Sequence, residues 1–326
     1  MAQTKRRKSG HPAGKRQHSA PNKLTKPTPA MWIAGARIRT LPLAIAPVAL
    51  GIGAATLITG DGVVGGLNRL GSLDWGLALL CLGVALFLQI GVNYSNDYSD
   101  GVRGTDEFRV GPPRLTGSGV ANPKRVLAVA LVFFALGAAC GVAIVLLTQQ
   151  WWLLIPGAIA IAAAYFYTGG KRPYGYYGLG EVFVFIFFGL VATVGTTYIL
   201  SGTYNVESLL AGAAAGFIAC AVLMVNNIRD IEQDRVAKKR TLAVLLGQRA
   251  SRIVFVVFLL LAYAILLLFS FLFPLAPLVF FTLLLSLPAI LIVLTGKTAK
   301  EFILALKLTS FMGLLFGLGL AAALTF

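Results

Sequence analysis

The chain has 326 residues, of which 57% are hydrophobic, and its mean hydropathy of +0.81 is far above that of soluble proteins. This composition excludes a soluble globular protein and predicts a membrane protein built from helices. The net charge of +16 does not indicate nucleic-acid binding, because the basic residues gather at the start of the chain and in every second predicted loop.

Residues 1–30 precede the first apolar stretch and are rich in Lys, Arg, Pro and Ser. They predict a disordered basic tail that lies against anionic lipid, and residues 31–326 then form one transmembrane domain. A nucleic-acid patch is the alternative interpretation of the polybasic run. Both histidines, His11 and His18, fall in the tail, so we expect no histidine chemistry in the transmembrane domain.

Nine apolar stretches follow, each close to the length of about 20 residues that a helix needs to cross a bilayer. They are residues 41–60, 75–97, 124–147, 151–168, 179–201, 207–228, 252–272, 275–295 and 302–325. The predicted fold is therefore an all-α polytopic bundle of nine transmembrane helices. Lys and Arg concentrate before the first stretch and after every second one, which predicts a cytoplasmic N-terminus and an outside C-terminus.

Two polar clusters end the second and sixth stretches, and seven of the 12 acidic residues lie in or beside them. The first cluster is Asn93, Asn96, Asp97 and Asp100, with Asp106 shortly after it. The second cluster is Asn226, Asn227, Asp230 and Asp234. Their spacing places each set on one face of a helix, at the C-terminal end, where the helix dipole favours positive charge. Carboxylates crowded in this way need a cation between them.

Carboxylate and amide oxygens are hard ligands that suit Mg²⁺, an ion usually completed by substrate phosphate. We therefore expect the metal ligands to be Asp97, Asp100, Asp106, Asp230 and Asp234. The four asparagines of the clusters are expected to contact substrate. A cation transporter is a rival interpretation, but its acidic residues should be spread to mid-membrane depth, whereas these gather at one membrane face.

Basic and aromatic residues in the same cytoplasmic loops would complete a phosphate site. The candidates are Arg103, Arg114, Lys171, Lys239, Arg240, Tyr165 and Tyr167. Topology alone also explains each basic residue, and an interfacial aromatic belt also explains the tyrosines. Lys171 is the strongest basic candidate, because it follows both tyrosines and a Gly-Gly turn, and we give it a catalytic role beside Asp97, Asp100, Asp230 and Asp234.

From about Ala34 onward the chain resembles the UbiA superfamily of intramembrane aromatic prenyltransferases. The motifs that carry the resemblance are Asn96-Asp97-x-x-Asp100 with Asp106, and Asn227-x-x-Asp230-x-x-x-Asp234. Other segments are similar to the branch that prenylates 1,4-dihydroxy-2-naphthoate in menaquinone synthesis. They are residues 36–42 (Ala-Arg-Ile-Arg-Thr-Leu-Pro), 167–173 (Tyr-Thr-Gly-Gly-Lys-Arg-Pro), 178–181 (Gly-Leu-Gly-Glu) and 239–244 (Lys-Arg-Thr-Leu-Ala-Val).

The resemblance implies a cell-membrane enzyme that uses Mg²⁺ to transfer a polyprenyl group from polyprenyl diphosphate to 1,4-dihydroxy-2-naphthoate. Diphosphate and CO₂ would be lost, and demethylmenaquinol would form at a site facing the cytoplasm. A different acceptor, such as 4-hydroxybenzoate or homogentisate, is the alternative within the superfamily. Five residues separate Asp100 from Asp106, where the superfamily often has three, and sequences of the menaquinone branch resemble this chain there.

Overall fold

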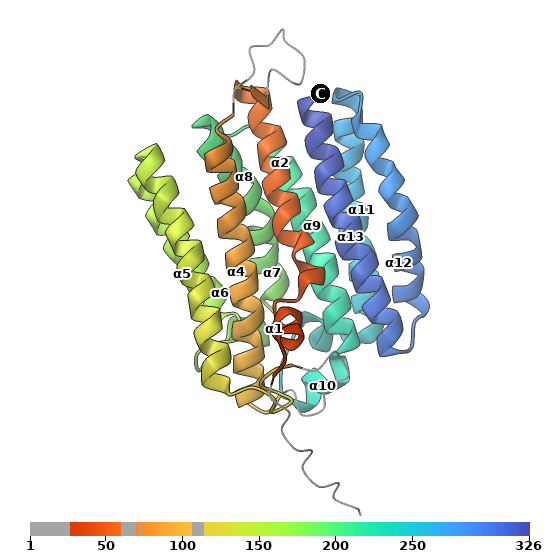
Figure 1. Ribbon diagram of the computed structural model, residues 1–326. Coiled ribbons are helices and arrows are strands. Elements are labelled where there is room, and N and C mark those ends of the chain that lie inside the picture. The colour runs from red at the N-terminus through yellow and green to blue at the C-terminus, as the bar shows by residue number, and fades with distance from the viewer. Residues whose placement is uncertain (1–26, 60–69, 72, 106–113) are drawn as a thin grey trace, which may run out of the picture.

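The computed structural model describes residues 27–59, 70–71, 73–105 and 114–326, which form an all-α bundle (Figure 1). Eight helical segments of this part of the chain are long and apolar enough to cross a membrane. They are α2 (Pro42–Thr59), α4 (Trp75–Val102), α5 (Pro123–Thr148), Gly180–Ser201, α9 (Val206–Arg229), α11 (Leu242–Leu272), Ala276–Thr295 and α13 (Ala299–Thr325).

The sequence predicted nine such helices, and the difference lies in the fourth stretch. Residues 151–168 form a short 3-10 turn and α6 (Leu154–Phe166), which together are shorter than the other eight segments. The helix is bounded on one side by Gln149, which adopts a left-handed conformation (φ 56°), and on the other by Gly169 and Gly170. The predicted all-α bundle is confirmed, with eight candidate spans in the described residues.

Several helices begin where a polar side chain accepts a hydrogen bond from a free backbone N–H group. Asp74 caps α4 by accepting from Leu77 N at 3.0 Å, and Asn122 caps α5 just before its first-turn proline. Capping boxes start α9 and α13, through Asn205 and Thr298 respectively. These caps satisfy N–H groups that hydrocarbon could not.

Helix α9 is the centre of the bundle and packs against α2, α11, α13 and the π-helical segment η4 (Phe185–Val191). Of its most apolar 18 residues, 72% are buried, the largest share among the eight segments. Its face toward η4 carries Gly212 and Gly216, and the two backbones meet closely at Gly189. Small residues at helix contacts are the usual means of close packing in lipid, where helices gain nothing from mutual hydrophobicity.

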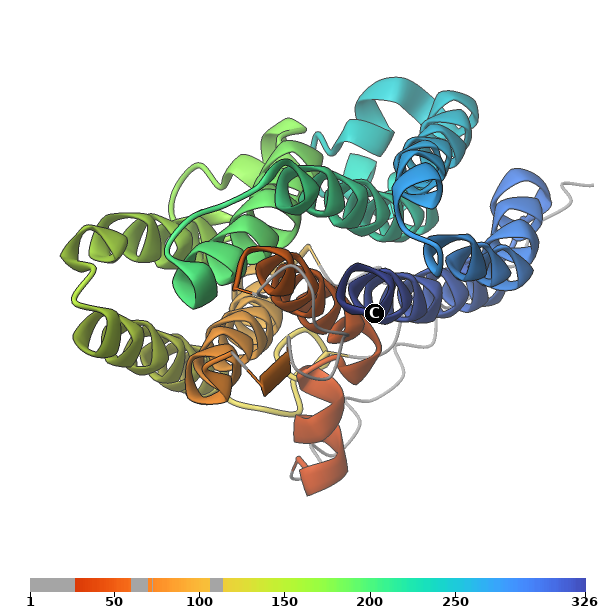
Figure 2. The same cartoon turned by 90° about the horizontal axis from the view of Figure 1, so that it is seen from above.

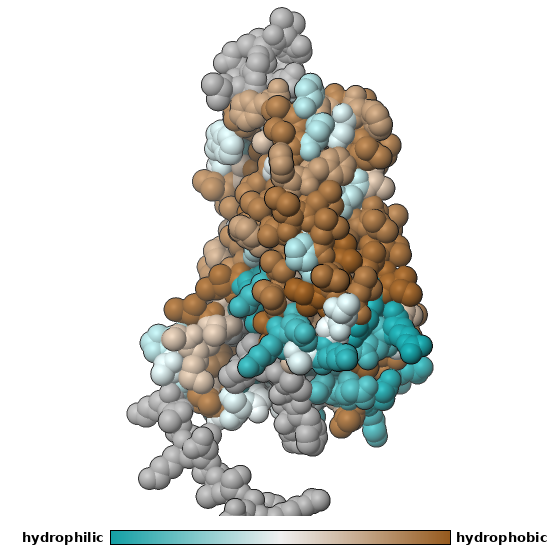
Figure 3. All heavy atoms as spheres, turned by 90° about the vertical axis from the view of Figure 1, so that its right-hand side faces the viewer, coloured by the Kyte–Doolittle hydropathy of each residue, from teal (hydrophilic) through white to brown (hydrophobic). Residues whose placement is uncertain are grey.

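The outer helices lie at the two ends of the bundle when it is seen from above, with α5 and α6 at one end and α11 and α12 (Leu283–Thr295) at the other (Figure 2). The side of the molecule is largely apolar, and polar side chains gather at the lower end (Figure 3). Helices α1 (Pro29–Gly35) and α10 (Ile231–Val236) lie at that lower end, as do the ends of α4 and α9 that carry the two clusters (Figure 1). The C-terminus lies at the opposite end.

The contact at Gly189 yields a stability prediction. A Cβ at this position would lie 2.5 Å from Gly212 O and 2.6 Å from Gly216 Cα, so Gly189→Ala should force the helices apart and cost about 1–3 kcal/mol. We expect a lower thermal midpoint in detergent. Gly195→Ala is the matched control, because nothing lies within 4 Å of a Cβ there. Equal midpoints for the two variants would contradict this account of the packing.

Candidate active site

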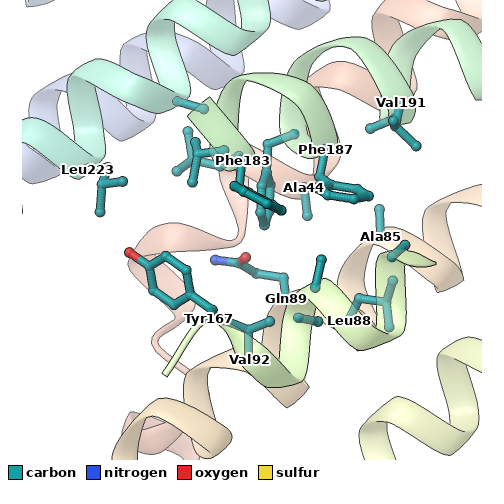
Figure 4. A pocket seen from close by; sticks show the side chains of 18 of the residues that line it. Ala44, Ala85, Leu88, Gln89, Val92, Tyr167, Phe183, Phe187, Val191 and Leu223 are labelled. Atoms are coloured by element: carbon teal, nitrogen blue, oxygen red, sulfur yellow. The ribbon is translucent and has the colours of Figure 1, made fainter. Parts of the chain in front are cut away.

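A cavity of about 770 Å³ runs between α2, α4, α6, α9 and the segment formed by α7 (Gly180–Val184), η4 and α8 (Ala192–Ser201). Its volume falls within the range of small-molecule sites. Figure 4 shows its apolar body, in which Leu88 and Val92 of α4 face Phe183 and Phe187, with Tyr167 beside them. Polar residues from both clusters line one end of the same cavity.

Most of the predicted site residues meet at this polar end. Those that line the cavity are Asn93, Asn96, Asp100, Arg114, Tyr167, Asn226, Asn227, Asp230, Asp234 and Lys239. Five other predicted residues do not line it, namely Asp97, Arg103, Tyr165, Lys171 and Arg240. Asp106 lies outside the described residues. The two clusters, more than 120 residues apart in the chain, therefore form one site.

Asp100 joins the two clusters. Its carboxylate is 2% exposed and accepts hydrogen bonds from Arg114 Nη1 at 2.6 Å and from the Tyr176 hydroxyl at 2.6 Å. Lys239, which follows the second cluster, completes the set with its Nζ 3.0 Å from Asp100 Oδ1. A buried carboxylate is stable only with such partners, so these contacts tie the end of α4 to Tyr176 and to the loop after α10 that carries Lys239.

The carboxylates of the second cluster differ in their pairing. Asp230 accepts from Arg229 Nε at 2.7 Å and Nη2 at 2.5 Å. In the described structure Asp234 has no ion-pair partner, and its side-chain hydrogen bond from Thr241 Oγ1 is 3.5 Å long. Burial raises the pKa of Asp234 to about 6, against the opposing effect of Lys239. Asp234 is thus the acid of the site with most need of a further cation.

The four asparagines of the clusters differ in which amide atom they leave for the cavity. Asn96 Oδ1 accepts from Thr168 Oγ1 at 2.6 Å, and Asn226 Oδ1 accepts from Arg229 Nη2 at 2.9 Å. These two therefore have N–H donors to offer, which suit phosphate oxygens. Asn93 Nδ2 donates to Ala36 O at 2.8 Å, and Asn227 Nδ2 donates to Glu181 Oε1 at 3.0 Å. They offer oxygen, which suits a hard cation.

Asp97 has a different position from the one its motif suggests. Its two oxygens accept from the backbone N–H groups of Thr116 and Leu115, at 2.8 and 2.9 Å. Asp97 therefore anchors the loop that carries Arg114 to the cavity.

The other predicted residues that do not line the cavity support it or lie on its outer side. Arg103 donates to the carbonyls of Thr168 and Gly170, and Arg240 N donates to Tyr176 O at 2.9 Å. Tyr165 packs edge-on against Phe166, and Lys171 lies on an exposed loop. Arg103 and Arg240 thus help to hold the loops around the site.

The sequence did not predict Tyr176 as a site residue, although it contacts three of the predicted ones, Arg103, Lys239 and Asp100. Lys239 Nζ lies 4.7 Å and Arg103 Cζ 5.5 Å from the centre of its ring, while its hydroxyl donates to Asp100. Burial, and then the charge of Asp100, raise the pKa of Tyr176 above its usual range, so the hydroxyl keeps its proton. The sequence signal was the aromatic run Tyr174-Gly-Tyr-Tyr, separated from the basic pair Lys171-Arg172 by a single proline.

Arg37 and Gln233 were also missed, and both line the polar end. Arg37 is held in a left-handed conformation with φ 52°, which is uncommon for a residue with a side chain. Gln233 Oε1 is buried without a hydrogen-bond partner in the described part of the chain.

The donor set at the polar end fits Mg²⁺. It combines the carboxylate of Asp234, the oxygens that Asn93 and Asn227 leave for the cavity, and the unpaired Oε1 of Gln233. Over the described ranges, no three acidic, histidine or cysteine side chains converge closely enough to hold a cation by themselves. Mg²⁺ typically takes only one or two carboxylates and completes its shell with water and substrate phosphate, so the set is sufficient.

Comparison with known proteins gives a consistent answer. Residues 55–311 match the UbiA prenyltransferase family. A 1,4-dihydroxy-2-naphthoate octaprenyltransferase from Mycobacterium tuberculosis is 49% identical over 226 residues, which cover 69% of this chain and 73% of that protein. The Escherichia coli protein of the same name is 38% identical over 68% of this chain and 70% of its own length.

Solved structures agree in fold. The apo structure of a UbiA homolog from Aeropyrum pernix gives a TM-score of 0.64 at 16% identity, covering 86% of this chain and 97% of that one. A UbiA homolog from Archaeoglobus fulgidus, bound to DMAPP and Mg²⁺, gives 0.56 at 17% identity over 90% and 99% of the two chains.

The position of Tyr176 leads to a prediction about the site. Tyr176→Phe keeps the ring beneath Lys239 and Arg103 but removes the hydrogen bond to Asp100, a bond to a charged group worth about 1.5–3 kcal/mol. We expect turnover to fall roughly tenfold or more, since 1.36 kcal/mol corresponds to a factor of ten. The neighbouring Tyr177 is 55% exposed, and Tyr177→Phe should leave turnover unchanged. Equal rates for both variants would show that the Tyr176 hydroxyl has no role.

Proposed function

The chain belongs to the UbiA prenyltransferase family, and we propose that it transfers a polyprenyl group from a polyprenyl diphosphate to 1,4-dihydroxy-2-naphthoate. The product is demethylmenaquinol. The acceptor is supported by relatives of that name, which are 49% and 47% identical to this chain. The observation that carries the proposal is a single cavity whose charged end continues into an apolar body.

The two parts of the cavity match the two parts of the donor. An uncharged polyprenyl tail gains free energy when it leaves water for the apolar body, near side chains such as Phe183, Phe187 and Val191. The diphosphate needs donors and positive charge, which the polar end offers through Arg114, Lys239 and the N–H groups of Asn96 and Asn226. The donor would therefore bind in one orientation only.

We assign Mg²⁺ to Asp234, with Asn93, Asn227 and Gln233 as oxygen donors beside it, and we retain Asp100 and Asp230 as ligands on the family resemblance. When bound, the ion neutralises negative charge that develops on the departing diphosphate. Asp97 acts instead through the loop that carries Arg114, and Asp106 is retained as a ligand on the family resemblance alone.

Arg114 and Lys239 can bind the diphosphate in addition to Asp100. Arg114 and Lys239 both contact Asp100, and each is placed to contact diphosphate when it arrives. Because the charges are already held in place, stabilising the leaving diphosphate requires little reorganisation of the protein.

The chemistry is an electrophilic substitution on the naphthoate ring. The bond between prenyl C1 and the diphosphate oxygen breaks, the pair of electrons leaves with diphosphate, and an allylic cation remains. The ring carbon that bears the carboxylate attacks this cation and forms the new carbon–carbon bond. CO₂ then departs and its bonding electron pair returns to the ring, so aromaticity is restored without a protein base.

Aromatic side chains between the two parts of the cavity would shield the cation. Tyr167 and Tyr174 have ring centres 5.5 Å apart, and Tyr174 stacks on Phe183 at 3.9 Å. All three line the cavity, where ring faces stabilise positive charge and exclude water.

The finer topology also belongs to the proposal. With Trp151–Phe166 counted as a ninth crossing, the charge distribution places the N-terminus and the active site in the cytoplasm and the C-terminus outside. Membrane lipid is then the partner of the basic tail, and we assign no nucleic acid to it.

Turnover of the purified protein with 1,4-dihydroxy-2-naphthoate, a polyprenyl diphosphate and Mg²⁺ tests the function. We expect prenylated quinol by mass spectrometry, and none with a chelator. Asp230→Ala should reduce the rate by roughly 100-fold or more. Glu232→Ala is the matched control two residues away, because this residue is exposed and pairs only with Arg235 among the described residues.

Other outcomes of that assay would contradict the proposal. Faster turnover of 4-hydroxybenzoate or homogentisate would contradict the acceptor. Metal-dependent cation flux in liposomes without any prenyl transfer would contradict the enzyme and support a transporter.

The proposed orientation has its own test. Single cysteines placed at exposed positions Thr203 and Lys300, in a background without the three native cysteines, lie at opposite ends of the bundle. In intact cells a membrane-impermeant maleimide should label Thr203→Cys and leave Lys300→Cys unlabelled until the membrane is opened. The reverse pattern would overturn the orientation.

A further inference from the structure

One buried acid lies next to the site but does not line the cavity. Glu181 is 4% exposed, belongs to α7 inside a membrane-spanning segment, and faces the end of α9. Its Oε1 accepts from Asn227 Nδ2 at 3.0 Å, and its Oε2 is buried with no hydrogen-bond partner in the described residues. An acid buried in this way lowers stability, so its presence calls for a function.

The chemistry of a carboxylate supplies that function. The Oε1 of Glu181 accepts a hydrogen bond, whereas an amide side chain can donate from one atom and accept at the other. Because Asn227 uses its donor Nδ2 toward Glu181, its Oδ1 is left for the cavity. A glutamine or serine at position 181 would permit both orientations.

We propose that Glu181 is a positioning residue that holds the side-chain oxygen of Asn227 toward the polar end of the cavity. This inference rests on the proposed Mg²⁺ and diphosphate site, where an oxygen attracts the cation and an N–H group would repel it. Outer partners that orient metal ligands commonly change metal affinity by roughly 10- to 100-fold when they are removed.

Three variants test the hydrogen bond itself. Glu181→Leu removes the acceptor, so the Asn227 amide is free to turn. Asn227→Asp places a second carboxylate against the buried Glu181. The double variant Glu181→Gln with Asn227→Asp reverses the direction of the bond, because the introduced glutamine amide then donates to the introduced aspartate. It still leaves an oxygen of residue 227 for the cavity.

The affinity for Mn²⁺, used in place of Mg²⁺, is measured by electron paramagnetic resonance. The samples contain a non-reactive prenyl thiodiphosphate and no acceptor. We expect roughly 10- to 100-fold weaker Mn²⁺ binding in Glu181→Leu and in Asn227→Asp, and recovery in the double variant. In turnover assays the Mg²⁺ concentration for half-maximal rate should rise in the same order. Cys220→Ala is the matched control, since the Sγ of Cys220 donates to the main-chain oxygen of Glu181, at 3.1 Å, and not to its carboxylate.

Each contrary result has a distinct meaning. Folded Glu181→Leu protein, with a normal thermal midpoint and unchanged Mn²⁺ binding, would overturn the positioning role. A double variant no better than Asn227→Asp would do the same. Wild-type protein that binds no Mn²⁺ would instead overturn the proposed metal site.

Discussion

The structure depends on keeping a buried negative charge at the polar end of an apolar bundle. Asp100 belongs to a membrane-spanning helix, and Arg114, Lys239 and Tyr176 converge on its carboxylate from three other segments of the chain. Removing such a group from water costs several kcal/mol unless its partners are close and well oriented. The same contacts that offset this cost also bring two distant clusters to one cavity, so the stability and the chemistry of the site have a common origin.

Hydrogen bonds within the protein also determine which amide atoms of the site are available to a ligand. Each asparagine of the clusters has one end of its amide bonded within the protein, which leaves the other end for the cavity. Donors and acceptors are thus fixed before any ligand binds. In such a site the N–H donors suit phosphate oxygens and the free oxygens suit a cation, and neither requires a conformational change. This is the basis of electrostatic preorganisation.

The sequence predicted the all-α membrane fold and the meeting of the two clusters, because hydropathy, charge asymmetry and helical spacing are local signals, and it predicted the family through the resemblance of its Asn/Asp motifs. It could not separate Asp97 from Asp100, since both lie near one helix face and only the folded loop shows which carboxylate is engaged by backbone N–H groups. Tyr176 and Glu181 were missed for the same reason, because their roles depend on partners far away in the chain. Lys171 was favoured by its neighbours in sequence, yet the loop turns it outward.

The anchoring of the loop by Asp97 has a consequence for how this protein can diverge. Asp97 binds main-chain groups of Leu115 and Thr116, and every amino acid except proline supplies such a group. This contact therefore permits substitution of the side chains at those two loop positions, but it does not permit substitution of the aspartate. Among homologues, Asp97 should stay constant opposite partners whose identities vary, a pattern that covariation between side chains would not reveal.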